Sequence, residues 1–191
     1  MQKIRTRMLC EGAVLVALAQ ILSLIKLWEM PWGGSITLSM FPIFLFAVRW
    51  GLRDGLLAGF VFGWCQLLGD GGFALSWQSM LGDYLAAFTA LGLAGLFYGK
   101  KGGVFWGTVV GSAARFLVHY VVGATVWAMY MPEEFFGMTM ISPWIYSLLY
   151  NGFYMAVDMA LCLVVFALAY RPLHRYLAPQ PSTRPGMQTG N

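Results

Sequence analysis

Charged residues are scarce in this sequence. Asp, Glu, Lys and Arg make up 10% of its 191 residues, whereas hydrophobic residues make up 59%. A soluble domain carries about 25% charged residues, so this chain has too few of them to cover a water-facing surface. A membrane-spanning helix needs roughly 20 apolar residues, and the length therefore accommodates about six spans with short loops. This leaves no room for an ATPase domain, and nucleic-acid binding is not expected.

The residues used in metal, redox and hydrolytic chemistry are also few. The three cysteines fall in separate apolar runs without C-x-x-C spacing, and two histidines cannot form an H-E-x-x-H zinc site. The sequence contains no G-x-S-x-G nucleophile elbow and no Walker A loop. We therefore expect a protein that is not an enzyme and that needs neither a metal nor a cofactor.

Long apolar runs predict an all-α integral membrane protein with six transmembrane helices. The predicted spans are residues 8–28, 35–50, 55–70, 77–98, 104–130 and 143–170. Ten of the twelve Lys and Arg residues lie before the first span, in alternate loops, or after the last span. Basic loops stay cytoplasmic. We therefore predict a bacterial cell-membrane protein with both termini on the cytoplasmic side. The membrane domain is predicted to cover 1–178, and the polar residues 179–191 are predicted to form a disordered tail.

Glycine recurs at every fourth position in two regions of the chain. One ladder is Gly51, Gly55, Gly59 and Gly63, and the other is Gly103, Gly107 and Gly111. This spacing places small residues on one helix face, where a neighbouring backbone can approach closely. We expect tight packing within the subunit, with a partner interface as the alternative. Ala13 and Ala17 form a further, weaker pair of this kind.

Several polar residues fall inside the predicted spans, where an ionisable group costs at least about 2.5–3.5 kcal/mol. By helix register, five polar or aromatic residues occupy the outer halves of three spans: Asp83, His119, Trp127, Tyr146 and Asn151. Their convergence predicts a small-molecule pocket that opens to the outside.

Each of these residues also has a purely structural interpretation. Trp127 and Tyr146 could be aromatic residues of the membrane interface, and His119 and Asn151 could form hydrogen bonds between helices. Asp83 is harder to explain in this way, because no base except His119 lies at its depth. A carboxylate surrounded by aromatic rings favours a small, aromatic, positively charged ligand.

Arg115 and Asp158 lie near the middle of adjacent predicted spans. Because either charge would be costly without a partner, we predict that they form a structural ion pair. Glu11 lies near the inner face, and we expect it to contact the interfacial bases or water.

Four motifs stand out along the chain: Gly33-Gly34-Ser35-Ile36-Thr37-Leu38, Asp83-Tyr84-x-x-Ala87-Phe88, Arg115-Phe116-x-x-His119 and Pro143-Trp144-x-Tyr146-Ser147-Leu148-x-Tyr150-Asn151-Gly152. With these motifs the sequence resembles the thiamine-binding S-component of energy-coupling factor (ECF) vitamin transporters. The resemblance extends over residues 8 to 170.

This resemblance implies a six-helix subunit that captures extracellular thiamine with high affinity. A separate transmembrane scaffold and two cytoplasmic ATPase subunits would then drive uptake. By position, Asp83 would bind the aminopyrimidine, and His119 and Trp127 would flank the thiazolium. The other residues implied by the resemblance are Tyr84, Tyr146, Asn151, Phe73 and the loop residue Trp32 at the pocket, and Ala13 and Ala17 at the scaffold. Some relatives have Glu at this position, and the side chain of Asp83 is shorter than that of Glu.

Two other functions stay open at this point. The chain could be an S-component for another small cationic or aromatic vitamin, or a stand-alone secondary transporter. An intramembrane enzyme and a structural assembly protein are further rivals. Binding of one ligand per chain, without turnover or gradient-driven flux, would distinguish an S-component from a secondary transporter, an enzyme and a structural protein.

Overall fold

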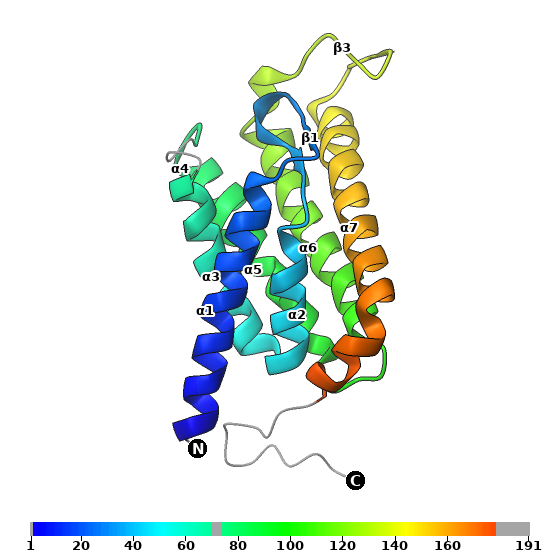
Figure 1. Cartoon of the computed structure of the whole chain (residues 1–191). Coiled ribbons are helices and arrows are strands. Elements are labelled where there is room, and N and C mark those ends of the chain that lie inside the picture. The colour runs from blue at the N-terminus through cyan, green and yellow to red at the C-terminus, as the bar shows by residue number, and fades with distance from the viewer. Residues whose placement is uncertain (1, 70–73, 179–191) are drawn as a thin grey trace.

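The structure of the chain is a computed structural model that describes residues 2–69 and 74–178. Within these residues, six helical segments run along the length of the molecule (Figure 1). They are α1 (Gln2–Leu24), α2 (Met40–Trp50), α3 (Leu52–Gly69), the segment Trp77–Phe97, α6 (Gly103–Thr125) and α7 (Pro143–Tyr176). The fold is thus all-α.

Four of these segments are long and apolar enough to cross a membrane: α1, Trp77–Phe97, α6 and α7. Helix α2 is apolar but has only 11 residues. The predicted span at 35–50 is wrong in its first five residues, because α2 begins at Met40. The residues before it form an antiparallel hairpin in which β2 (Ser35–Ile36) pairs with β1 (Trp28–Glu29). Gly33, in the 3-10 turn η1 (Pro31–Gly33), has a φ of 101° that favours glycine.

A second hairpin lies between α6 and α7. It follows the 3-10 turn η4 (Ala128–Tyr130) and pairs β3 (Glu134–Phe135) with β4 (Met138–Thr139). Both hairpins lie at the upper end of the molecule in Figure 1, whereas the start of α1 and the end of α7 lie at the lower end. The N-terminal end of α1 and the C-terminal end of α7 therefore lie on the same side of the molecule, as the predicted topology requires.

The segment Trp77–Phe97 changes its helical geometry along its length. It begins as α4 (Trp77–Ser79), continues as the π-helix η2 (Met80–Ala86) and α5 (Ala87–Ala90), and ends as the 3-10 helix η3 (Leu91–Phe97). π-Helical turns widen a helix locally and are frequent at functional sites. Asp83 lies within this turn.

Glycines bring two helices close to the segment Trp77–Phe97, which packs against both α3 and α6. A Cβ atom added at Gly59 would lie 2.4 Å from the carbonyl oxygen of Phe88. A Cβ added at Gly111 of α6 would lie 3.0 Å from the carbonyl oxygen of Leu91. The prediction that the glycine ladders pack within the subunit is confirmed. Gly51 differs from the other glycines of the two ladders because it ends α2 with a φ of 91°.

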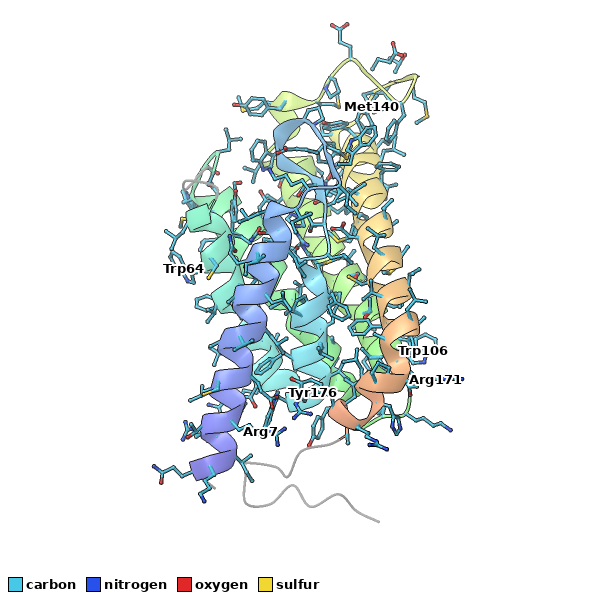
Figure 2. All side chains as sticks on the ribbon, in the orientation of Figure 1. Arg7, Trp64, Trp106, Met140, Arg171 and Tyr176 are labelled. Atoms are coloured by element: carbon cyan, nitrogen blue, oxygen red, sulfur yellow. The ribbon has the colours of Figure 1, made fainter. Side chains whose placement is uncertain are left out.

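Polar contacts of Glu11 anchor the N-terminal half of helix α1 to α2 and α7. Glu11 accepts hydrogen bonds from Arg49 Nε at 2.6 Å, Trp50 Nε1 at 2.9 Å and the Tyr176 hydroxyl at 3.0 Å. It also pairs with Arg7 at 2.8 Å, so the expectation that Glu11 contacts interfacial bases is confirmed. Figure 2 shows Arg7 and Tyr176 at the end of the molecule opposite Met140.

Candidate ligand-binding site

A cavity of about 460 Å³ lies near the hairpin end of the molecule. Small-molecule pockets have volumes of about 300–1,000 Å³, so this cavity is large enough for one small ligand. Its walls come from α1, the first hairpin, α3, η2, α6 and α7. Its polar lining includes Ser79, Asp83, Arg115, His119, Ser147 and Asn151.

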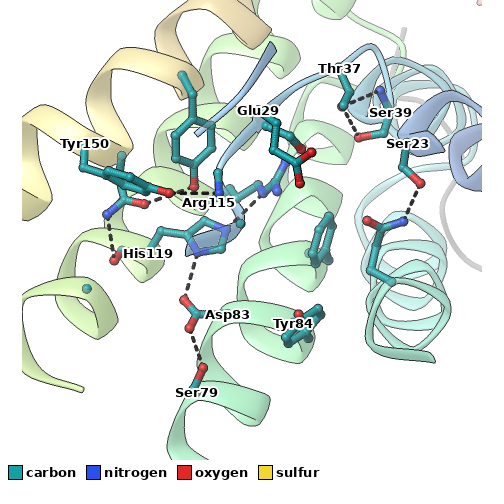
Figure 3. Close-up of a pocket in the computed structure, with 18 of the residues that line it drawn as sticks. Ser23, Glu29, Thr37, Ser39, Ser79, Asp83, Tyr84, Arg115, His119 and Tyr150 are labelled. Atoms are coloured by element: carbon teal, nitrogen blue, oxygen red, sulfur yellow. Dashed lines mark hydrogen bonds and ion pairs between the residues drawn. The ribbon is translucent and has the colours of Figure 1, made fainter. Parts of the chain in front are cut away.

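Asp83 is the centre of the hydrogen bonds at one end of the cavity (Figure 3). Its Oδ2 accepts hydrogen bonds from Ser79 Oγ and Trp127 Nε1, both at 2.8 Å. Its Oδ1 lies 3.0 Å from His119 Nδ1. Because Ser79 lies one turn earlier in the same segment while His119 and Trp127 come from α6 and its C-terminal end, the carboxylate joins two elements.

His119 continues this network towards the middle of α6. Its Nε2 accepts a hydrogen bond from Arg115 Nε at 3.3 Å, one turn earlier in the helix. The Arg115 guanidinium lies over the ring of Phe88, with its carbon 4.2 Å from the ring centroid. Both side chains are buried and both line the cavity.

Asn151 of α7 connects the cavity wall to α6. Its Nδ2 donates to the Ser147 carbonyl at 3.1 Å and lies 3.4 Å from the carbonyl oxygen of His119. The Tyr154 hydroxyl donates to Asn151 Oδ1 at 3.0 Å. Asn151 therefore lines the cavity and also bonds between helices, so the structural interpretation and the pocket interpretation both apply to it.

Aromatic side chains form another part of the wall. Tyr146, Tyr150 and Tyr154 lie one turn apart on α7, with neighbouring ring centroids 5.6 and 5.9 Å apart. Trp127 lies 5.7 Å from Tyr130 between ring centroids. All five residues line the cavity. A carboxylate and several π faces thus border one space, which is the arrangement that attracts an organic cation.

Tyr150 also holds the first hairpin against α7. Its hydroxyl donates to the Pro31 carbonyl and accepts a hydrogen bond from the Gly34 amide at 3.0 Å. A Cβ added at Gly34 would lie 2.8 Å from this hydroxyl, so glycine permits the close approach.

Most of the described helical domain matches one protein family. The family model described as "Thiamine transporter protein (Thia_YuaJ)" matches residues 9–177. This chain belongs to that family. The family consists of transport proteins, so the expectation that the chain is not an enzyme is confirmed.

Individual members of the family support this assignment. The chain is 33% identical to thiamine transporter ThiT of Bacillus subtilis over 184 residues, which are 88% of this chain and 93% of the relative. It is 29% identical to ThiT of Lacticaseibacillus paracasei over 159 residues, covering 74% and 76% of the two chains.

Two solved structures share the fold. ThiT from Listeria monocytogenes superposes with a TM-score of 0.81 at 22% identity, over 92% of this chain and 99% of that chain. The S component of a bacterial ECF transporter superposes with a TM-score of 0.61 at 16% identity, over 91% and 98% of the two chains. The family resemblance found in the sequence is therefore confirmed, and its fold is the S-component fold.

The structure brings most of the predicted site residues together. Asp83, Tyr84, His119, Trp127, Tyr146 and Asn151 all line the cavity. Phe73 and the side chain of Trp32 lie outside the part of the chain that the structure describes. Ala13 and Ala17 do not line the cavity and are exposed on α1.

The predicted ion pair between Arg115 and Asp158 is wrong. Asp158 Oδ1 accepts a hydrogen bond from the Thr37 amide at 2.8 Å, and Arg115 donates to His119 instead. These two charged side chains form no salt bridge in the described structure. The extended segment before α2 presents the Thr37 N–H to Asp158, and this bond satisfies a buried donor that would be costly to leave unpaired.

The residues around the cavity that sequence reasoning did not assign to the site include Ser79, Tyr150 and Tyr154. The tyrosines carried a readable signal, because positions 146, 150 and 154 recur at four-residue spacing and so share one helix face. Ser79 carried none in isolation, since a serine one turn before an acid is common in any helix.

Proposed function

We propose that this protein is the thiamine-binding S-component of a bacterial ECF transporter, which captures extracellular thiamine for ATP-driven uptake. The observation that carries this proposal is the position of Asp83. Its carboxylate, half-buried in the described structure, borders the cavity together with several aromatic rings, within a family of thiamine transporters. Thiamine combines an aminopyrimidine donor group with a thiazolium cation, and both match such a wall.

The residues of the cavity suggest how thiamine would be held. Asp83 would accept a hydrogen bond from the aminopyrimidine, and Trp127 and His119 would lie beside the thiazolium. Tyr84, Tyr146 and Asn151 would complete the wall. The cavity volume of about 460 Å³ suits a ligand with two small rings.

The ends of the molecule support an orientation in the cell membrane. Lys3, Arg5 and Arg7 lie at the end of α1 away from the hairpins, and Arg171 and Arg175 lie at the same end on α7. By the positive-inside rule this end would be cytoplasmic. The cavity would then open towards the outside, and six helices would cross the membrane with both termini inside.

Uptake would require protein partners. The chain contains no nucleotide-binding motif, so a scaffold subunit and two cytoplasmic ATPases would supply the energy. Ala13 and Ala17 are exposed small residues on α1, and we assign them to the surface that meets the scaffold.

Titration of the purified protein with thiamine tests the proposal. We expect one thiamine per chain by calorimetry, no gradient-driven flux by the isolated subunit in vesicles, and quenching of tryptophan fluorescence. Trp127→Phe should remove most of the quenching. Trp106→Phe is the matched control, because Trp106 is 63% exposed on α6 and does not line the cavity. Absence of both heat and quenching at micromolar thiamine would refute the proposal, and tighter binding of another vitamin would favour the alternative ligand.

A further inference from the structure

The hydrogen bonds around His119 define where its proton lies. A guanidinium group donates hydrogen bonds and cannot accept them. Because Arg115 Nε lies 3.3 Å from His119 Nε2, that ring nitrogen must be the acceptor. The proton of a neutral His119 is therefore on Nδ1, where it is donated to Asp83 Oδ1 over 3.0 Å. The three side chains form a directed chain from Arg115 through His119 to Asp83 (Figure 3).

We propose that Arg115 is a positioning residue for ligand recognition, because its N–H group occupies Nε2 of His119 and so keeps this imidazole neutral, as an Nδ1–H donor to the Asp83 carboxylate. This inference rests on the proposed function in that Asp83 is taken as the group that binds the ligand. Arg115 would act through His119, whose tautomer is set by the hydrogen bond at its other nitrogen.

The surroundings of Arg115 support this role. The side chain is 8% exposed, and its Nη1 is a buried nitrogen without a hydrogen-bond partner among the described residues. A buried charge in such a position is costly, and an ion pair would offset that cost. Asp158 instead accepts the Thr37 amide, while Phe88 supports the guanidinium only through its ring face. The directional bond that Arg115 does form is the one to His119.

Loss of Arg115 would disturb Asp83 in a defined way. Without Arg115 at Nε2, that nitrogen is free to take a second proton, while Asp83 keeps the first proton on Nδ1. The resulting imidazolium would neutralise the Asp83 carboxylate and would compete with a cationic ligand for it. The Asp83 side chain itself would be unchanged in such a variant.

Nitrogen-15 NMR of histidine can observe this tautomer directly. The chain has two histidines, His119 and His174, so the His174→Gln variant assigns the spectrum of [15N]histidine-labelled protein. In the unmodified protein we expect His119 to be protonated at Nδ1 and unprotonated at Nε2. In Arg115→Met, which keeps a long side chain and removes the donors, we expect Nε2 to become protonated as well, so that both ring nitrogens carry a proton. Thiamine affinity should fall about 10- to 100-fold, the range found when residues that hydrogen-bond to metal ligands are mutated.

A matched variant separates positioning from general damage to the core. Asp158→Asn changes another buried polar group on the neighbouring helix without touching His119, and it should leave the His119 spectrum unchanged. An unchanged protonation state of His119 in Arg115→Met would overturn the inference. If that variant does not accumulate, the unmodified protein decides, because an Nε2–H or doubly protonated His119 would also overturn it. The NMR measurement needs no thiamine, so failure of thiamine binding would refute the proposed function and leave this inference standing.

Discussion

Asp83 accepts three hydrogen bonds and still lines the cavity. A carboxylate has about four lone-pair sites, so three donors leave one site for a ligand. The same donors compensate for the burial of the charge, which would otherwise be costly. The single remaining acceptor site is directional, and this makes Asp83 suited to recognise one donor group of a ligand.

Asp83→Asn should weaken thiamine binding by about 1.5–3 kcal/mol, the contribution of a hydrogen bond to a charged group, or roughly 10- to 150-fold in Kd. The amide also places an N–H group opposite donors from Ser79, Trp127 or His119. Calorimetry measures the change. Glu134→Gln is the control, because it removes a negative charge from an exposed hairpin residue outside the cavity. Binding by Asp83→Asn within twofold of the unmodified protein would show that the carboxylate does not face the ligand.

Asp158 provides a second prediction at this scale. Its Oδ1 accepts the buried Thr37 amide at 2.8 Å. Asp158→Ala leaves that N–H without a partner and should lower the free energy of unfolding by about 1–3 kcal/mol. Asp158→Asn keeps an oxygen acceptor and should be less damaging. Thermal unfolding in detergent compares the two, and equal melting temperatures would contradict the assigned hydrogen bond.

The positions of single residues were more predictable than their partners. Helix register placed Asp83, His119 and Asn151 at similar depths, and a shared cavity follows from that. The partner of Asp158 could not be found in this way. It depends on how the segment before α2 crosses α7, and no periodicity in the sequence reports the path of an extended segment.

At the scale of elements, the segment Trp77–Phe97 positions Asp83 because glycines on both sides allow it to lie deep in the bundle. Gly59 of α3 contacts the backbone near Phe88, and Gly111 of α6 contacts the backbone near Leu91. Four-residue spacing of small residues predicted this packing. The mixture of π, α and 3-10 turns was not predicted, because hydrophobic periodicity does not distinguish between them.

Gly59→Ala tests this packing. The added Cβ would lie 2.4 Å from the Phe88 carbonyl oxygen, so the helices must separate. Such overpacking costs about 1–3 kcal/mol, and the melting temperature should fall. Gly152→Ala on α7 is the matched control, because its Cβ would meet the Phe116 ring at an ordinary 3.7 Å. Similar melting temperatures for both variants would contradict the close approach of α3.

The first hairpin shows why one predicted span was misplaced. Ile36 is buried and Leu38 is partly buried, so the segment before α2 appears in a hydropathy pattern as part of an apolar run. Hydropathy records burial and not backbone geometry. The 11 residues of α2 extend only about 16 Å at 1.5 Å per residue, and the extended segment provides the remaining length up to the cavity.

At the scale of the whole molecule, α1 is less buried within the helix bundle than the other three candidate spans. Its buried residues are Met8, Val16 and Ala19, and Glu11 binds Arg49 of α2 and Tyr176 of α7. Ala13 and Ala17 are exposed on a different face of the same helix. Neither lines the cavity, so ligand binding and contact with a partner would use separate parts of the protein.

Ala17→Trp should therefore separate binding from transport. Ala17 is exposed, so a bulky side chain is accommodated by the isolated subunit, and thiamine affinity and melting temperature should be preserved. The same bulk would prevent the close backbone approach that a scaffold helix needs, so uptake of labelled thiamine by cells and co-purification with the scaffold should fall. Ala19→Trp is the matched control, because Ala19 is 0% exposed and its replacement should damage folding and binding together. Full uptake by cells that contain normal amounts of the Ala17→Trp protein would exclude this face of α1 as the docking surface.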